Sequence, residues 1–209
     1  MITVTGATGL TGRHLFEGLV AVGLPVRALV HNEQAVRRLP ARVAETVVGD
    51  MLVPADTERA VAGSDAVVHI GPVMHPREIA MGETVIEAAT AADVGHFLQM
   101  SVTHPQLNHP SKLAAERRLL MSPVPFTILQ PMHYMQDVDV ATTVSEGVFR
   151  QPFSLDMPMS FVDLADVGEV AALVLSDPQR ALKRRFARVV FHLLQPTNDA
   201  APACLPTAA

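Results

Sequence analysis

This sequence has very little cysteine and few aromatic residues. One cysteine in 209 residues excludes a disulfide framework and any site built from several thiolates. The chain has no tryptophan, a single tyrosine and 4% aromatic residues. No apolar run approaches the roughly 20 residues that a membrane-spanning helix needs. The first residues lead directly into a strand-like pattern, without the basic and apolar regions of a signal peptide, so we expect a cytoplasmic protein.

Charge and hydropathy narrow the class of protein further. The formal net charge is −5 and the pI about 6.0, which argues against general binding to nucleic acid. Charged residues make up 18% of the chain and hydrophobic residues 49%, a balance that argues against disorder. A length of 209 residues suits one domain, or one domain with a small additional lobe.

Short β-branched runs alternate with longer helix-like runs over the first two thirds of the chain. We expect strands at residues 2–5, 25–30, 43–48, 65–70, 96–101 and 125–130. We expect helices between them at residues 10–22, 33–39, 76–92 and 111–121. This alternation predicts an α/β fold, a Rossmann-type doubly wound parallel sheet with helices on both faces.

The alternation breaks after Pro131, which divides the predicted organisation into three parts. Residues 1–130 form the predicted dinucleotide-binding domain, and residues 131–177 a small, partial lobe. Within this lobe a short strand at 160–162 leads into a helix that Asp163 could cap. Residues 178–209 begin as a basic segment and end rich in alanine and proline, so we expect an atypical tail whose last ten residues are frayed.

A glycine-rich segment, residues 5–12, joins the first expected strand to the first expected helix. A strand, a glycine turn and a helix N-terminus direct free backbone N–H groups and the positive end of the helix dipole at one point. Gly6 permits the tight turn, Gly9 lets a pyrophosphate approach, and Gly12 lets helix and strand pack closely. The alternative is a plain glycine-rich turn. We predict a dinucleotide site that includes Gly6, Thr8, Gly9, Leu10 and Gly12.

The residues after the second strand bear on the choice of cofactor. NAD-preferring folds place an acid about 20 residues beyond the glycines, where it binds the ribose 2′-hydroxyl. That count reaches Asn32, and no acid occurs between Pro25 and Asn32. Arg27 and His31 stand there instead, and Arg13 follows the third glycine. Since arginine holds a phosphate through a bidentate charged contact, we predict NADP (NADPH) as the preferred cofactor and keep NAD as the alternative.

Loops after the next two strands are expected to complete the cofactor cleft. Asp50 and Met51 follow the third strand, where Asp50 could accept from an adenine amino group or be a generic loop acid. Ile70 and Gly71 follow the fourth strand and should form one wall, because such sheets bind ligands at the carboxyl ends of their strands.

Several segments together resemble the NmrA-like family of atypical short-chain dehydrogenases. The matching segments lie at 4–9, 26–30, 108–112, 126–131, 134–136 and 160–167, together with Glu116. The resemblance covers residues 1–177. It implies a Rossmann domain that binds NAD(P)(H) and a small C-terminal substrate lobe. The tail departs from the family pattern, so we expect this lobe to be shortened and incomplete.

The resemblance also identifies candidate catalytic residues. Ordinary short-chain dehydrogenases carry a tyrosine four residues before the active-site lysine, whereas Asn108 stands four residues before Lys112. Lys112 matches the family's lysine and could bind the nicotinamide ribose or exchange a proton. Ser101 matches the family's serine and could polarise a substrate oxygen. Tyr134, the only tyrosine, could line the substrate pocket. Surface, turn and core roles are the alternatives for these residues.

Three hypotheses about function follow. The first is NADPH-dependent hydride transfer to a quinone-like or other small apolar acceptor, which needs a weaker proton donor than a carbonyl does. The second is a non-catalytic, NAD(P)-sensing regulator of NmrA type, and the third is a truncated relative with little function of its own. We expect a small-molecule partner, no metal, no nucleic acid and no membrane, and we keep a homo-oligomer open.

Overall fold

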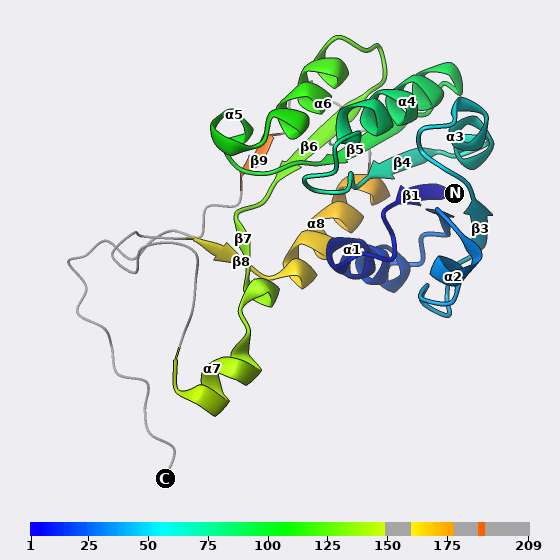
Figure 1. The fold of residues 1–209 in the computed structure, drawn as a ribbon. Helices are drawn as coiled ribbons and strands as arrows, with labels where there is room; N and C mark the ends of the chain where they lie inside the picture. Colours follow the sequence, from blue (N-terminus) through cyan, green and yellow to red (C-terminus); the bar gives the residue numbers. More distant parts are fainter. Residues whose placement is uncertain (149–159, 178–187, 191–209) are drawn as a thin grey trace.

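The computed structural model describes residues 1–148, 160–177 and 188–190 of the chain (Figure 1). Its strands are β1 (Ile2–Thr5), β2 (Val26–Val30), β3 (Glu45–Val48), β4 (Ala66–His69), β5 (His96–Met100), β6 (Phe126–Gln130), β7 (His133–Tyr134), β8 (Phe161–Val162) and β9 (Arg188–Val190). Its helices are α1 (Leu10–Ala21), α2 (Glu33–Val36), α3 (Pro54–Val61), α4 (Glu78–Ala91), α5 (Pro105–Asn108), α6 (Pro110–Leu120), α7 (Val140–Glu146) and α8 (Leu164–Ser176), with a short 3-10 helix at Met135–Asp137. The six strands predicted for the first domain are confirmed, each within two residues of its expected ends.

β1 is an interior strand of a parallel sheet in the order β3-β2-β1-β4-β5-β6-β9. Val4 of β1 pairs with Ala28 of β2 on one side and with Val68 of β4 on the other. Because the strand order reverses between β1 and β4, the loops that follow these two strands meet at the carboxyl edge of the sheet. The predicted Rossmann-type, doubly wound parallel sheet is therefore confirmed.

Helices cover both faces of the sheet (Figure 1). On one face α1 and α8 pack against β1 and β2 through buried side chains such as Phe16 and Val167. On the other face α4 and α6 pack against β4, β5 and β6 through side chains such as Ile86 and Leu119. Burying one such large apolar side chain contributes about 2 kcal/mol. Two cores thus hold the central strands, and with them the loops at the sheet's carboxyl edge, in fixed positions.

Helices α1 and α8 cross at two glycines. A Cβ atom on Gly18 would lie 2.5 Å from the carbonyl carbon of Gly168, and one on Gly168 would lie 2.6 Å from the carbonyl oxygen of His14. The two backbones therefore touch, which a larger side chain at either position would prevent. Since α1 follows the glycine-rich segment directly, this contact with α8 fixes the helix that faces the cofactor cleft.

The segment after β6 contains a second, two-stranded sheet of β7 and β8. The strand and capped helix predicted from residue 160 onward are confirmed, because the Asp163 carboxylate accepts from the Ala165 N–H at 2.7 Å and α8 begins at the next residue. The Gln136 amide donates to the same carboxylate at 2.7 Å. These donors, the Ala165 N–H foremost, hold the pKa of Asp163 below its ordinary value. Helix α7 stands away from the main sheet and buries no residue (Figure 1).

Some elements differ from the prediction. Helices α3, α5 and α7 were not expected; α3 buries only Thr57, Ala60 and Val61, a stripe too short to show a clear helical period. The predicted tail, residues 178–209, lies outside the described residues except for β9, which adds a parallel strand beside β6. No described helix is long and apolar enough to cross a membrane. Within the same ranges, no three His, Cys, Asp or Glu side chains gather as a metal site.

Candidate functional site

The glycine-rich segment after β1 forms a tight turn against the loop after β4. Gly6 has a φ of +69°, which an L side chain rarely adopts, and a Cβ there would lie 2.6 Å from the carbonyl oxygen of Ile70. The Gly9 N–H donates to the Gly6 carbonyl at 3.0 Å. A Cβ on Gly12 would lie 2.1 Å from that same carbonyl oxygen. The glycines therefore bring the start of α1 up against both β1 and the β4 loop.

The N-terminus of α1 is left open for a ligand. Gly9 is the N-cap residue, no side chain caps the helix, and no acid occurs in its first turn. The first N–H groups of a helix have no partner within it, and the helix dipole adds partial positive charge at this end. This set of donors fits a pyrophosphate group, as a dinucleotide cofactor would present.

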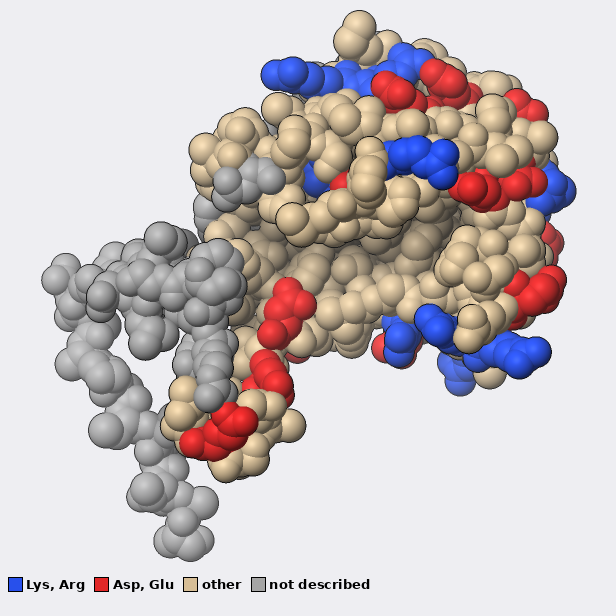
Figure 2. Space-filling model, viewed as in Figure 1, with Lys and Arg blue, Asp and Glu red and all other residues tan. Residues whose placement is uncertain are grey.

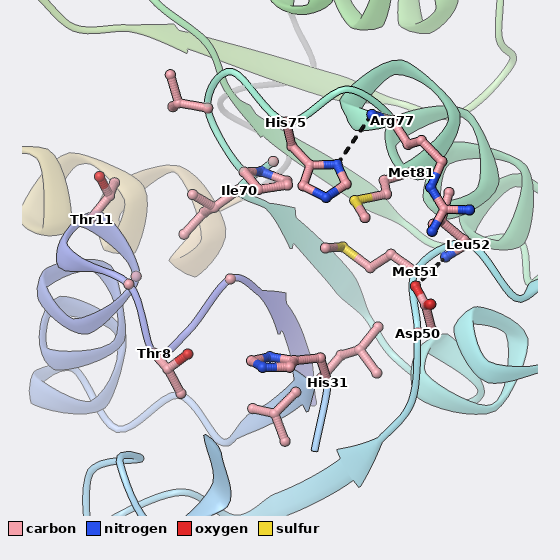
Figure 3. Close-up of a pocket in the computed structure, with 18 of the residues that line it drawn as sticks. Thr8, Thr11, His31, Asp50, Met51, Leu52, Ile70, His75, Arg77 and Met81 are labelled. Atoms are coloured by element: carbon pink, nitrogen blue, oxygen red, sulfur yellow. Dashed lines mark hydrogen bonds between the residues drawn. The ribbon is translucent and has the colours of Figure 1, made fainter. Parts of the chain in front are cut away.

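A cleft of about 720 Å³ opens in front of this helix end. Figure 2 shows the hollow on this face of the molecule, between α4 and the helices α1 and α2. In Figure 3, Thr8 and His31 lie on one side of the cleft and His75, Arg77 and Met81 on the other. Asp50, Met51 and Leu52 lie at the end of the cleft away from Thr11 (Figure 3). The cleft is thus built from the loops that follow the first four strands.

Most of the predicted cofactor residues line this cleft. They are Gly6, Thr8, Gly9, Leu10, Gly12, His31, Asp50, Met51, Ile70 and Gly71. Asp50 is partly engaged in its own loop, because its Oδ1 accepts from the Leu52 N–H at 2.9 Å. Arg13 lies beside the cleft rather than in its lining, with its Nε donating to the Thr8 carbonyl at 3.3 Å.

Arg27 is a correction to the predicted site. Its Nε lies 2.6 Å from the Glu45 carboxylate, and its Nη1 donates to the carbonyls of Ala60 and Ala62 at 2.8 and 2.7 Å. The guanidinium therefore caps the C-terminus of α3, where the helix dipole favours a cation. Arg27 does not line the cleft, and we remove it from the candidate cofactor residues.

A smaller pocket of about 220 Å³ continues from the cleft. The two share four lining residues, namely Thr11, Ile70, Gly71 and Val73. The three predicted catalytic residues, Ser101, Lys112 and Tyr134, all line this smaller pocket, together with Met132, His133 and Asp137. They come from the end of β5, the first turn of α6 and β7, so residues far apart in the sequence meet at one place.

Lys112 is buried and paired. Its Nζ lies 2.7 Å from Oε1 of Glu78 and donates to the Gly71 carbonyl at 3.3 Å. The other oxygen of Glu78 accepts from the Ser111 hydroxyl at 2.7 Å. An ammonium group has three N–H donors, so this arrangement leaves one for a group in the smaller pocket.

The Lys112 charge also affects a neighbouring histidine. His69 ends β4, and its Nδ1 lies 2.8 Å from the Thr5 hydroxyl. Burial, and secondarily the charge of Lys112, lowers the pKa of His69 to about 3. His69 is therefore neutral at physiological pH and adds no charge beside the ammonium.

Ser101 is linked to a second buried carboxylate. Its hydroxyl donates to Oε1 of Glu116 at 2.5 Å, and the Gln130 amide donates to the same oxygen at 2.6 Å. Glu116 is 5% exposed and lines neither pocket, so it lies behind Ser101.

Tyr134 closes the smaller pocket on the side of α1. Burial raises the pKa of Tyr134 above its ordinary value of 10.0, a side-chain hydrogen bond with Thr11 opposes this rise, and the charge of Asp137 adds to it. The phenol is therefore protonated at neutral pH and acts as a hydrogen-bond donor.

Sequence reasoning missed several residues of the site. His75, Arg77 and Met81 line the larger cleft, and Glu78 holds Lys112. Glu78 is the first residue of α4, and an acid in the first turn of a helix is ordinarily explained by the helix dipole alone. The burial of Glu78 beside a lysine from another helix becomes visible only in the folded chain.

The sheet order and the glycine turn together define a Rossmann-type α/β protein. Within that class, the chain belongs to the NmrA-like family, whose model matches residues 1–198. The match runs past residue 177, where the sequence resemblance was expected to end, and it includes β9.

Individual relatives agree with this membership. The chain is 29% identical to the NAD(P)H azoreductase of Xenophilus azovorans, over 85% of this chain and 64% of the azoreductase. It is similar to the NADPH-dependent quinone oxidoreductase of Escherichia coli complexed with NADPH, with a TM-score of 0.74, 25% identity and coverage of 85% of this chain and 65% of the oxidoreductase. It also has the fold of NmrA, a negative transcriptional regulator, with a TM-score of 0.71, 23% identity and coverage of 86% and 63%. The chain thus spans less than two thirds of the length of each.

Proposed function

We propose that this chain binds NADP(H) in the larger cleft and passes hydride to a small apolar acceptor in the smaller pocket. The observation that carries the proposal is the continuity of the two pockets through Thr11, Ile70, Gly71 and Val73. A dinucleotide whose pyrophosphate lies at the start of α1 has its adenine half toward His31 and Asp50 and its nicotinamide half toward the smaller pocket. The bound cofactor supplies the hydride.

The residues of the chain orient the reactants and exclude water. The backbone N–H groups at the start of α1 hold the pyrophosphate, and Arg13 and His31 favour the 2′-phosphate of NADP over the bare ribose of NAD. The free N–H donor of Lys112 binds the nicotinamide ribose or the acceptor, and the phenol of Tyr134, which lines the same pocket, donates to the acceptor. Met132 and the ring of His133 give the pocket an adaptable, largely apolar wall for a flat acceptor.

The acceptor class is inferred from chemistry and from relatives. Asn108 stands where ordinary short-chain dehydrogenases have their tyrosine, so a quinone or an azo compound, which accepts hydride readily, suits the site better than a simple ketone. An azoreductase and a quinone oxidoreductase among the relatives support this choice.

Turnover with two acceptors tests the proposal. NADPH oxidation is followed at its own absorbance with a soluble benzoquinone and with an azo dye, for the parent and for Lys112→Met. We expect turnover with NADPH, slower turnover with NADH, and a large loss in Lys112→Met. Glu87→Gln, which removes a charge from an exposed side chain, is the control and should leave the rate of NADPH oxidation unchanged.

The missing tyrosine also favours a second candidate, a regulator that binds NAD(P) without consuming it. Tight binding of NADPH and NADP⁺ with no oxidation by any acceptor would support this candidate and contradict the first. Cofactor binding is common to both.

A further inference from the structure

The Ser101–Glu116 pair connects the smaller pocket to a buried carboxyl group. Ser101 lines the pocket, and its hydroxyl lies 2.5 Å from Oε1 of Glu116. Gln130 of β6 donates to that same oxygen at 2.6 Å. Ser101 is 3% exposed and Glu116 is 5% exposed, so bulk water does not compete for these contacts. The pair extends from the pocket surface into the interior.

A serine hydroxyl has one hydrogen, and its direction depends on Glu116. When the Glu116 carboxylate is ionised, Ser101 donates its hydrogen to Oε1 and presents only lone pairs to the pocket. When Glu116 carries a proton, the carboxyl group donates to Ser101, and the hydroxyl hydrogen is free to point into the pocket. The protonation state of Glu116 therefore determines whether the Ser101 hydroxyl accepts a hydrogen bond from a ligand or donates one to it.

The hydrogen-bond partners of Glu116 are neutral groups. Lys112 lies one turn before Glu116 on α6, but its ammonium group is engaged by Glu78 and Gly71. Among the described residues no cation forms an ion pair with Glu116, whose hydrogen-bond donors, Ser101 and Gln130, are both neutral. Both forms of Glu116 keep the same two partners, so a proton can be gained or lost without rebuilding the site.

We propose that Glu116 stores the proton that Ser101 delivers to the acceptor, in place of the tyrosine whose position Asn108 occupies. This inference rests on the proposed function. The acceptor receives two electrons and one hydrogen as hydride from the reduced nicotinamide. Its oxygen or nitrogen then takes the Ser101 hydroxyl proton, while Glu116 transfers its own proton to Oγ. The acceptor gains two hydrogens, Ser101 is unchanged, and Glu116 is left ionised until water in the vacated pocket reprotonates it through Ser101.

Glu116→Gln separates this relay from a structural role. The glutamine carbonyl still accepts from Ser101 and Gln130, so the hydrogen bonds are kept while the transferable proton is removed. We expect Glu116→Gln and Ser101→Ala each to slow turnover by about 100-fold, within the usual range for general acid catalysis. The double variant should be no slower than either single variant, because both interrupt the same path. Glu87→Gln is the matched control at an exposed carboxylate.

The pH profile and cofactor affinity distinguish the possible failures. The pH dependence of the rate should differ between the parent and Glu116→Gln, because only the parent holds a transferable proton at this position. Calorimetry should show the same NADPH affinity in all variants. Parent-like rates and pH dependence in Glu116→Gln would overturn the relay while leaving the proposed function intact. If the parent itself did not bind NADPH, the proposed function would be overturned instead.

An infrared measurement tests the relay without turnover. The difference spectrum between parent and Glu116→Gln should contain a protonated carboxyl band, and Ser101→Ala should shift that band. A spectrum with no protonated carboxyl band from Glu116 would contradict the proposal even if the enzyme proved inactive.

Discussion

Nζ of Lys112 and Oε1 of Glu78 lie 2.7 Å apart in a buried ion pair, each side chain being 5% exposed. Removing one partner leaves the other charge buried alone, which costs about 3–5 kcal/mol. Glu78→Gln and Lys112→Met should each lower the free energy of unfolding by roughly this amount in urea titrations. The Lys112→Met, Glu78→Leu double variant should recover much of the loss.

The exposed pair of Arg118 and Glu87 is the natural control for that experiment. Their side chains are 39% and 62% exposed, and such pairs contribute less than about 1 kcal/mol. If Glu78→Gln proved as mild as Glu87→Gln, Glu78 would not hold Lys112 in the way described.

Two glycine substitutions should have opposite effects on stability, one at the contact between α1 and α8 and one inside α4. Gly168→Ala places a methyl group against the backbone of His14 and should destabilise the protein by about 1–3 kcal/mol. Gly82→Ala lies inside α4, where its Cβ would have no neighbour closer than 3.6 Å. It should stabilise the protein by up to about 1 kcal/mol, because alanine favours a helix. Thermal unfolding of both variants checks the contrast, and equal melting temperatures would contradict it.

Acid should destabilise the protein through two buried histidines. Burial lowers the pKa of His69 to about 3 and that of His96 to about 4, from 6.5 in each case. Between these values and 6.5 the unfolded chain binds more protons than the folded chain, so stability falls as the pH falls. The slope approaches about 1.4 kcal/mol per pH unit for each histidine.

Unfolding titrations between neutral pH and about pH 5 isolate this effect, because carboxyl groups titrate mostly below that range. His69→Gln should reduce the slope on acidification. A slope identical to that of the parent would show that His69 is not held neutral by the fold.

Arg13 should act on the choice between NADPH and NADH. Its Nε donates to the carbonyl of Thr8, which lines the cleft, and a 2′-phosphate would lie near this residue in the proposed orientation. Arg13→Ala should weaken NADPH binding by about tenfold, the equivalent of one charged hydrogen bond, and leave NADH binding nearly unchanged. Arg27→Ala should alter stability rather than this ratio, because Arg27 caps α3. If Arg13→Ala weakened the binding of NADPH and of NADH equally, Arg13 would not contribute to the choice between the two cofactors.

The sheet and the glycine turn could be predicted because their signals are local. Two patterns can be recognised without knowing any distant contact. They are the apolar strand runs, such as Val26–Val30, and the spacing of Gly6, Gly9 and Gly12. Arg27 was assigned to the cofactor site because the strand pattern alone does not show where a long side chain points. In the folded chain its direction is set by the carbonyl groups at the end of α3. Glu78 and Glu116 were not assigned roles because each looks like an ordinary helix acid until folding places it against Lys112 or Ser101.

The most direct test of the account is a calorimetric titration of the parent and of Gly9→Asp with NADPH. Gly9 has an extended backbone with a φ of −76°, and a Cβ there meets only the Gly6 carbonyl oxygen at 3.4 Å, so aspartate fits and is a good N-cap. The variant should fold with parent-like stability, while its carboxylate occupies the N–H groups of α1 and repels a pyrophosphate. NADPH should bind to the parent and should not bind to Gly9→Asp. Equal binding by both, or binding by neither, would contradict the account.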